Sequence, residues 1–304
     1  MKRFRANGNG LELSIVEWEA ASPRATSELA TARSADPSTC VLLHGFMDAA
    51  ESFDLVAPAL AASGLRVLAP DLRGFGESDR VGGYAPFGPS AAPAARTSGG
   101  GYYHFPDYVA DLDAVVSKLA PEPFFLVGHS MGGTVATLFA GARPERVTKL
   151  AVLEGLGPPD HPPELAPVRM TQWLDDLASP RPPKKTSDED ALRRLAIAHP
   201  RVPREILETR LPRLFHDGAW RHDPMHRTTS PMPFFAAVYR AFAARVACPV
   251  LFVSGGPLGW RVPDEAERLA AFANVTHVDL PDAGHMMHWT APAALATALL
   301  GFFT

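Results

Sequence analysis

The chain has 304 residues, 46% of them hydrophobic, and a formal net charge of −4. This length suits one large α/β domain with an insertion, or two ordinary domains, and its core needs no disulfide or metal. Basic and acidic residues are interspersed, which argues against a nucleic-acid partner. No apolar run reaches transmembrane length, and polar residues 7–10 interrupt a secretory leader, so we expect a cytoplasmic protein without a membrane partner.

Strand-like and helix-like segments alternate over most of the chain. Strands are expected where short runs are apolar or alternate in polarity, at residues 2–5, 11–18, 39–43, 66–69, 124–127, 147–153, 249–254 and 276–280. Helices are expected between them, at residues 52–63, 106–119, 131–143, 263–272 and 291–303. This alternation predicts an α/β fold, with a mostly parallel eight-stranded sheet covered by helices on both faces.

Residues 157–245 break the alternation, because they carry many prolines and no strand signal. Helix-like pieces occur within them at 168–177, 188–199 and 204–214. We interpret this insertion as a helical cap over the carboxyl edge of the sheet, with residues 1–156 and 246–304 as the core. Two stretches rich in small residues, 20–38 and 82–101, lack an apolar period and are expected to be surface excursions.

Ser130 stands in a Gly-x-Ser-x-Gly pattern between an apolar strand and a helical stretch. This context is typical of a nucleophile elbow, although a simple turn of small residues would leave a similar pattern. Glycines permit the tight turn and the close packing around it. The serine would then lie beside a helix N-terminus, which favours developing negative charge.

His285 follows the last predicted strand, so a parallel sheet would bring it to the same edge as Ser130. An imidazole there can act as the base that a serine nucleophile needs. His288 lies one turn further along, and we assign it a structural role. The acid that orients His285 is expected at Glu154, at the end of a buried strand; Asp264 is the alternative, although it resembles a helix start.

Two backbone N–H groups should bind the oxyanion, those of Phe46 and Met131. Their apolar side chains are also expected to line the acyl pocket. Further substrate contacts are assigned to residues of the adjoining loops: His44, Gly45, His129 and Trp260.

Four motifs together resemble the α/β-hydrolase superfamily, in order and in spacing. They are His44-Gly45-Phe46, residues 71–78, residues 128–133 and Ala283-Gly284-His285. The resemblance covers the chain from about residue 10 to the end and is weaker over the insertion. Residues 154–158 and 220–224 are similar to its serine hydrolase/esterase-like branch.

The resemblance implies a core of eight strands, a helical cap and a serine–histidine–acid triad. The chain departs from the usual pattern after the seventh strand, where residues 254–260 contain no carboxylate. Serine at the elbow sets the chain apart from the dehalogenases and epoxide hydrolases of this fold, which use an aspartate.

The expected function is hydrolysis of a carboxylic ester of a small or medium hydrophobic molecule, through an acyl-enzyme and without a cofactor or metal. Alternatives are a carbon–carbon hydrolase on a diketone, with Arg169 or Arg221 binding its carboxylate, and a non-catalytic ligand-binding protein. Cys40 and Cys248 lead into apolar runs and are expected in the core, not in a disulfide or metal site. The sequence does not predict an oligomeric state.

Overall fold

The computed structural model describes residues 1–21, 38–81, 103–178 and 185–304. The two predicted excursions lie outside this description, apart from residues 20, 21 and 38.

An eight-stranded sheet forms the centre of the molecule, in the order β1-β2-β4-β3-β5-β6-β9-β10. Its strands are β1 (Lys2–Asn7), β2 (Glu12–Trp18), β3 (Thr39–Leu43), β4 (Arg66–Pro70), β5 (Phe124–His129), β6 (Val147–Leu153), β9 (Val250–Ser254) and β10 (Val275–Asp279). The strand β2 runs antiparallel to β1 and β4, and the pairs from β4 to β10 are parallel. The predicted mostly parallel, eight-stranded α/β sheet is confirmed.

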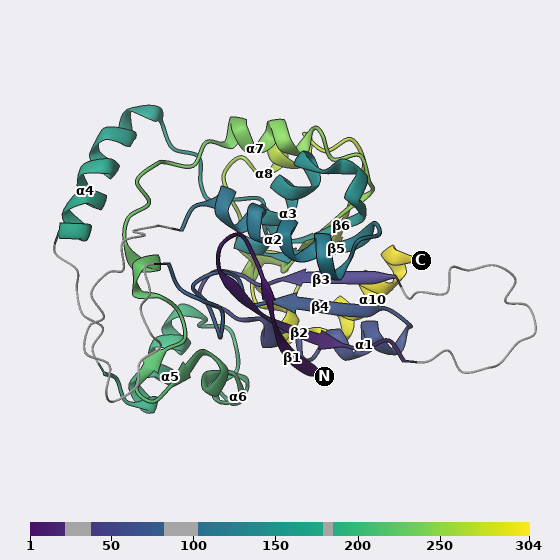
Figure 1. The fold of residues 1–304 in the computed structure, drawn as a ribbon, viewed down its shortest axis with the longest axis horizontal. Helices are drawn as coiled ribbons and strands as arrows, with labels where there is room; N and C mark the ends of the chain where they lie inside the picture. The colour runs from purple at the N-terminus through teal and green to yellow at the C-terminus, as the bar shows by residue number, and fades with distance from the viewer. Residues whose placement is uncertain (22–37, 82–102, 179–184) are drawn as a thin grey trace, which may run out of the picture.

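Helices cover both faces of this sheet (Figure 1). One face carries α2 (Phe105–Leu119), α3 (Met131–Ala142), α7 (Ala236–Ala243) and α8 (Glu265–Leu269), and the other carries α1 (Ala57–Ala62) and α10 (Pro292–Phe303). Successive residues of a strand point to opposite faces, so Val41 and Leu43 join the first core layer while Cys40 and Leu42 join the second. Cys40 and Cys248 are both buried and unbridged, as expected.

The three predicted helices of the insertion are present. They are α4 (Ala166–Ala178), α5 (Asp188–Ala198) and α6 (Arg204–Leu214). In Figure 1, α4 stands apart from the sheet, and none of its side chains is fully buried. The helices α5 and α6 instead form an apolar cluster with Met286 and Trp289, which closely follow His285.

The expectation that the insertion lacks strands was wrong. Strands β7 (Phe215–His216) and β8 (Ala219–Trp220) form a small hairpin. Asp217 and Gly218 turn it with positive φ values of 51° and 79°. Strands of two residues are too short to produce the alternation from which strands are predicted.

The last helix of the insertion packs on the core. Tyr239 on α7 donates a hydrogen bond of 3.1 Å to Thr137 on α3, and Arg245 donates one of 3.0 Å to the Gly141 carbonyl. Among the helices that the structure describes, none is long and apolar enough to cross a membrane.

Candidate active site

Ser130 occupies the turn between β5 and α3, with φ 51° and ψ −118°. This conformation is strained for a residue with a Cβ, and such strain costs on the order of 1–3 kcal/mol. The turn is tight because its glycines pack against backbone. A Cβ on Gly128 would lie 2.3 Å from the Gly132 carbonyl oxygen, and one on Gly132 would lie 2.3 Å from that of Leu43. The predicted strand, turn and helix around Ser130 are all present.

The two backbone groups predicted for the oxyanion adjoin this turn. Met131 is the first residue of α3, so its N–H has no acceptor within the helix. The loop carrying Phe46 passes close to the elbow, since a Cβ on Gly45 would lie 3.2 Å from the Ser130 Cβ. Within the described residues we find no hydrogen bond from the N–H of Phe46 or Met131. Both groups therefore remain available to a ligand.

Glu154 follows the last residue of β6 and is 4% exposed. Its Oε2 accepts a hydrogen bond of 2.8 Å from His285 Nδ1 and one of 2.6 Å from the Trp260 N–H. Its Oε1 accepts a hydrogen bond of 2.5 Å from the Gly255 N–H. Two of these donors belong to the loop after β9, where the sequence lacks an acid. The Glu154 carboxylate therefore lies against this loop, where an acid of the loop itself would otherwise be expected.

Small residues make room for this carboxylate. A Cβ on Gly259 would come within 1.8 Å of Glu154 Oε1, and one on Gly255 would collide with the Gly284 carbonyl oxygen at 2.1 Å. Glu154 itself has a positive φ of 46°. The geometry therefore depends on glycines in one loop and on backbone strain at the acid.

The elbow also holds the loop of His285. His129 Nε2 lies 2.9 Å from the His285 carbonyl oxygen, and the two rings are 4.7 Å apart. Since Glu154 takes Nδ1 of His285, Nε2 is the ring nitrogen that is left to accept a proton. The histidine side chain is 28% exposed.

The structure does not bring Asp264 to His285. Asp264 is the N-cap residue of α8, and its two oxygens pair with the buried Arg268 at 2.8 Å each. This is the helix-start position that the sequence suggested for it.

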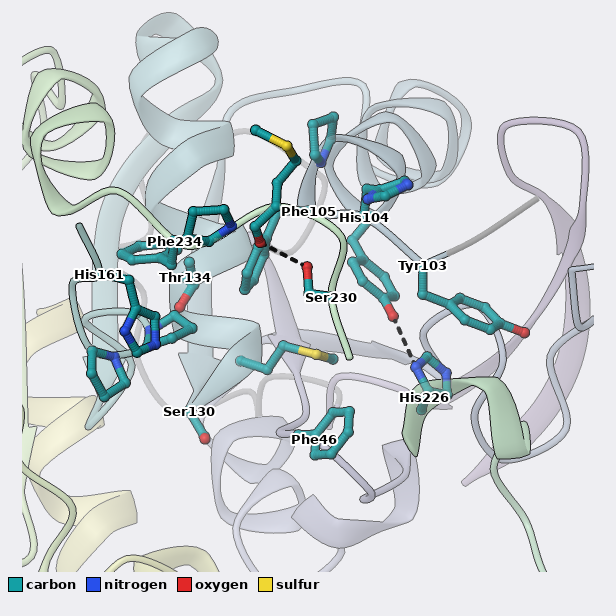
Figure 2. Close-up of a pocket in the computed structure, with 18 of the residues that line it drawn as sticks. Phe46, Tyr103, His104, Phe105, Ser130, Thr134, His161, His226, Ser230 and Phe234 are labelled. Atoms are coloured by element: carbon teal, nitrogen blue, oxygen red, sulfur yellow. Dashed lines mark hydrogen bonds between the residues drawn. The ribbon is translucent and has the colours of Figure 1, made fainter. Parts of the chain in front are cut away.

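A cavity of about 510 Å³ opens next to Ser130 (Figure 2). Most of its wall is apolar, with Phe46, Phe105 and Phe234 among the side chains drawn. Met131, Glu154 and Trp260 also line it, as does Arg169 from α4. A cavity of this size and character is typical of a small-molecule site.

His44, Gly45 and His129, which were expected to contact substrate, are not among the described residues that line this cavity. His44 is fully buried, where it donates to the Gly45 carbonyl (2.7 Å) and accepts from the Leu72 N–H (2.9 Å). Burial lowers the pKa of His129 well below its ordinary value, so this ring is neutral. Trp260 does line the cavity.

His288 is fully buried behind the site, as a structural role requires. Its Nε2 lies 2.8 Å from the Ser52 hydroxyl and 3.4 Å from Asp48. Asp48, His129 and His288 place potential metal ligands within 4.8 Å of one another. Each of the three has a hydrogen-bond partner within the protein, while the Nδ1 atoms of His129 and His288 are buried without one among the described residues.

The sequence did not predict the aromatic contacts that form part of the cavity wall. His226 stacks between Phe75 and Tyr103, with ring centroids 4.0 and 3.8 Å away. Tyr103 in turn donates a hydrogen bond of 2.7 Å to Asp223, which joins the core side of the wall to the insertion. Burial lowers the pKa of His226 well below its usual value. These residues come from segments without periodicity, so their meeting was not predictable.

The comparisons with known proteins agree with the fold. The family model of the alpha/beta hydrolase fold matches residues 40–292. A 3-hydroxybutyrate-oligomer hydrolase of Cupriavidus necator is 28% identical over 285 residues, with 87% of this chain and 88% of that protein covered. A hypothetical protein of Pseudomonas aeruginosa PAO1 has a similar structure, with a TM-score of 0.78, 28% identity and coverage of 100% and 99%. A serine hydrolase-like protein of Dictyostelium discoideum is 29% identical over 150 residues (49% of this chain), but the match spans only 34% of that protein.

Proposed function

Because this chain belongs to the alpha/beta hydrolase family, we propose that it is a serine hydrolase that cleaves carboxylic esters of small or medium molecules. The observation that carries this proposal is the contact of Glu154 with His285 beside a strained Ser130. The hydrolase activity named for the Cupriavidus relative supports it.

In the proposed reaction, the Ser130 Oγ attacks the ester carbonyl carbon while His285 Nε2 takes its proton. The N–H groups of Phe46 and Met131 bind the oxygen that becomes negative. The tetrahedral intermediate then expels the alkoxide, which leaves as an alcohol with the proton from His285. Glu154 holds the imidazole in position and stabilises its charged form.

A water molecule completes the cycle. His285 takes a proton from the water, and the resulting hydroxide attacks the acyl carbon on Ser130. Collapse of this second intermediate breaks the bond to Oγ, which recovers its proton from His285. The products are a carboxylic acid and the free enzyme.

Two other functions were considered from the sequence. A non-catalytic role was suggested by the missing acid after the seventh strand; the hydrogen bonds from that loop to Glu154 support a catalytic role instead. A carbon–carbon hydrolase would need a cation for the carboxylate of its substrate. Arg221 is paired with Glu77 at 2.7 Å, whereas Arg169 lines the cavity, so only Arg169 fits that need.

The proposal is tested by hydrolysis of p-nitrophenyl esters from acetate to dodecanoate, with Ser130→Ala as the matched variant. We expect turnover by the natural chain, loss of turnover in the variant, and a mass increase at Ser130 after treatment with an organophosphonate. Cleavage of a vinylogous diketone without ester turnover would favour the carbon–carbon hydrolase. A folded protein that takes no label at Ser130 would favour the non-catalytic reading.

A further inference from the structure

The ionic groups of the cavity are unevenly matched. Glu154 is the only Asp or Glu among the described residues that line it, and its oxygens are occupied by three donors. Arg169 is the only Lys or Arg in the same lining. The cavity thus holds one carboxylate, whose oxygens already accept hydrogen bonds from the protein, and one cation.

Arg169 has no ionic partner among the residues that the structure describes. Its Nε donates a hydrogen bond of 3.2 Å to the Ser230 carbonyl, and it enters no ion pair there. Some other arginines of the insertion pair with carboxylates, as Arg210 and Arg213 do with Asp54. Of the ranges outside the description, 82–102 and 179–184 contain no Asp or Glu, and 22–37 contain Glu28 and Asp36.

The position of Arg169 makes this absence informative. The residue is half-buried on α4, a helix with no fully buried side chain. Its hydrogen bond to the Ser230 carbonyl uses Nε, which leaves the two terminal nitrogens to bind a ligand. A guanidinium presents a planar fork that matches a carboxylate, and a partly desolvated cation gains most from such a partner. The polar residues Ser230 and Thr228 lie in the same lining, among mainly apolar side chains.

We propose that the cavity binds an ester whose acyl chain ends in a carboxylate, which pairs with Arg169 while the ester carbonyl lies at Ser130. The substrate class is therefore a monoester of a dicarboxylic acid, or a similar ester with a distal carboxylate. This inference rests on the proposed esterase function. The apolar wall would contact the carbon chain between the two polar ends.

The test compares p-nitrophenyl monoesters of dicarboxylic acids of six to ten carbons with matched esters in which a primary amide replaces the free carboxylate. The amide has the same shape without the charge. We expect kcat/KM to be about 10- to 100-fold higher for the carboxylate in the best-fitting pair, the size expected of a charge-assisted hydrogen bond. High salt should reduce this preference, because it screens a partly exposed ion pair.

Variants of Arg169 identify the group responsible. Arg169→Met should bring the ratio of the two kcat/KM values close to one, and Arg169→Lys should retain part of it. The exposed Arg201, between α5 and α6, is the matched control, and Arg201→Met should keep the ratio of the natural chain. An unchanged ratio in Arg169→Met would overturn the proposal, because another group would then recognise the carboxylate.

The outcomes separate this proposal from the esterase function. If both esters are cleaved equally in a reaction that needs Ser130, the function stands and the carboxylate site is wrong. If neither ester is cleaved, the function fails, and calorimetric titration with the free dicarboxylates decides the site. Binding that Arg169→Met abolishes would then support an anion site, and no binding would refute it.

Discussion

Replacing Glu154 by glutamine would remove its charge and nearly keep its shape. All three groups that contact this carboxylate are N–H donors, two on the backbone and one on His285. A glutamine offers one oxygen and one NH₂, so it must turn a donor toward another donor. If the NH₂ faces His285, the imidazole proton moves from Nδ1 to Nε2, and Nε2 can no longer take the proton of Ser130.

The expected effect is a loss in kcat of roughly 10³- to 10⁴-fold, the size found when a triad acid becomes an amide. This corresponds to about 4–5.5 kcal/mol of transition-state stabilisation. The assay is p-nitrophenyl ester turnover under saturating conditions, with the free energy of unfolding measured alongside. Since substrate does not touch Glu154 directly in this mechanism, KM should change much less than kcat.

Asp264→Asn is the matched control, since it makes the same chemical change in the other candidate acid. Asp264 pairs with Arg268, whose side chain is 0% exposed, so this variant should unfold more easily, by about 1–3 kcal/mol. Its kcat should stay within a few-fold of the natural chain. The reasoning is refuted if Glu154→Gln keeps activity within tenfold or if Asp264→Asn is the variant that loses it.

Three further outcomes are expected. Gly259→Ala should lower kcat at least roughly tenfold, because the new Cβ would displace the Glu154 carboxylate. Gly301→Ala is the control and should keep kcat, since its new Cβ has no neighbour within 4 Å. Steady-state kinetics of the two variants gives the comparison. Ser130→Gly should be more stable than Ser130→Ala by about 1 kcal/mol in urea unfolding, because glycine relieves the positive φ; equal stability would contradict the strain. Burial lowers the pKa of His226, so the unfolded chain binds a proton more readily than the folded chain does. The free energy of unfolding should therefore fall between about pH 7 and about pH 5. His226→Phe should make this slope shallower, by at most about 1.4 kcal/mol per pH unit.

The parts of the site that follow from local sequence were predictable. A strand, glycines and a helix around Ser130 impose one turn, and His285 follows the last strand of a parallel sheet. Glu154 could be chosen over Asp264 because it ends a buried strand, and the structure does place it against His285. The position of its carboxylate against the glycines of the loop after β9 depends on how the two segments pack, and local sequence does not predict it.

Other parts depend on contacts that no local pattern encodes. His129 was expected to contact substrate, yet its ring lies against the loop that carries His285. Likewise, the meeting of Tyr103 with His226 joins segments more than a hundred residues apart. Such wall contacts depend on how the insertion packs against the core, which no local sequence pattern encodes.

The helices of the insertion differ in how closely they pack against the rest of the molecule. α5 and α6 share an apolar cluster with Met286 and Trp289, so a change there reaches the loop that carries His285. α4 has no fully buried side chain, yet it supplies part of the cavity wall. Mutations on α4 can therefore change this part of the cavity wall at little cost in folding, so that the wall can vary while the fold is kept.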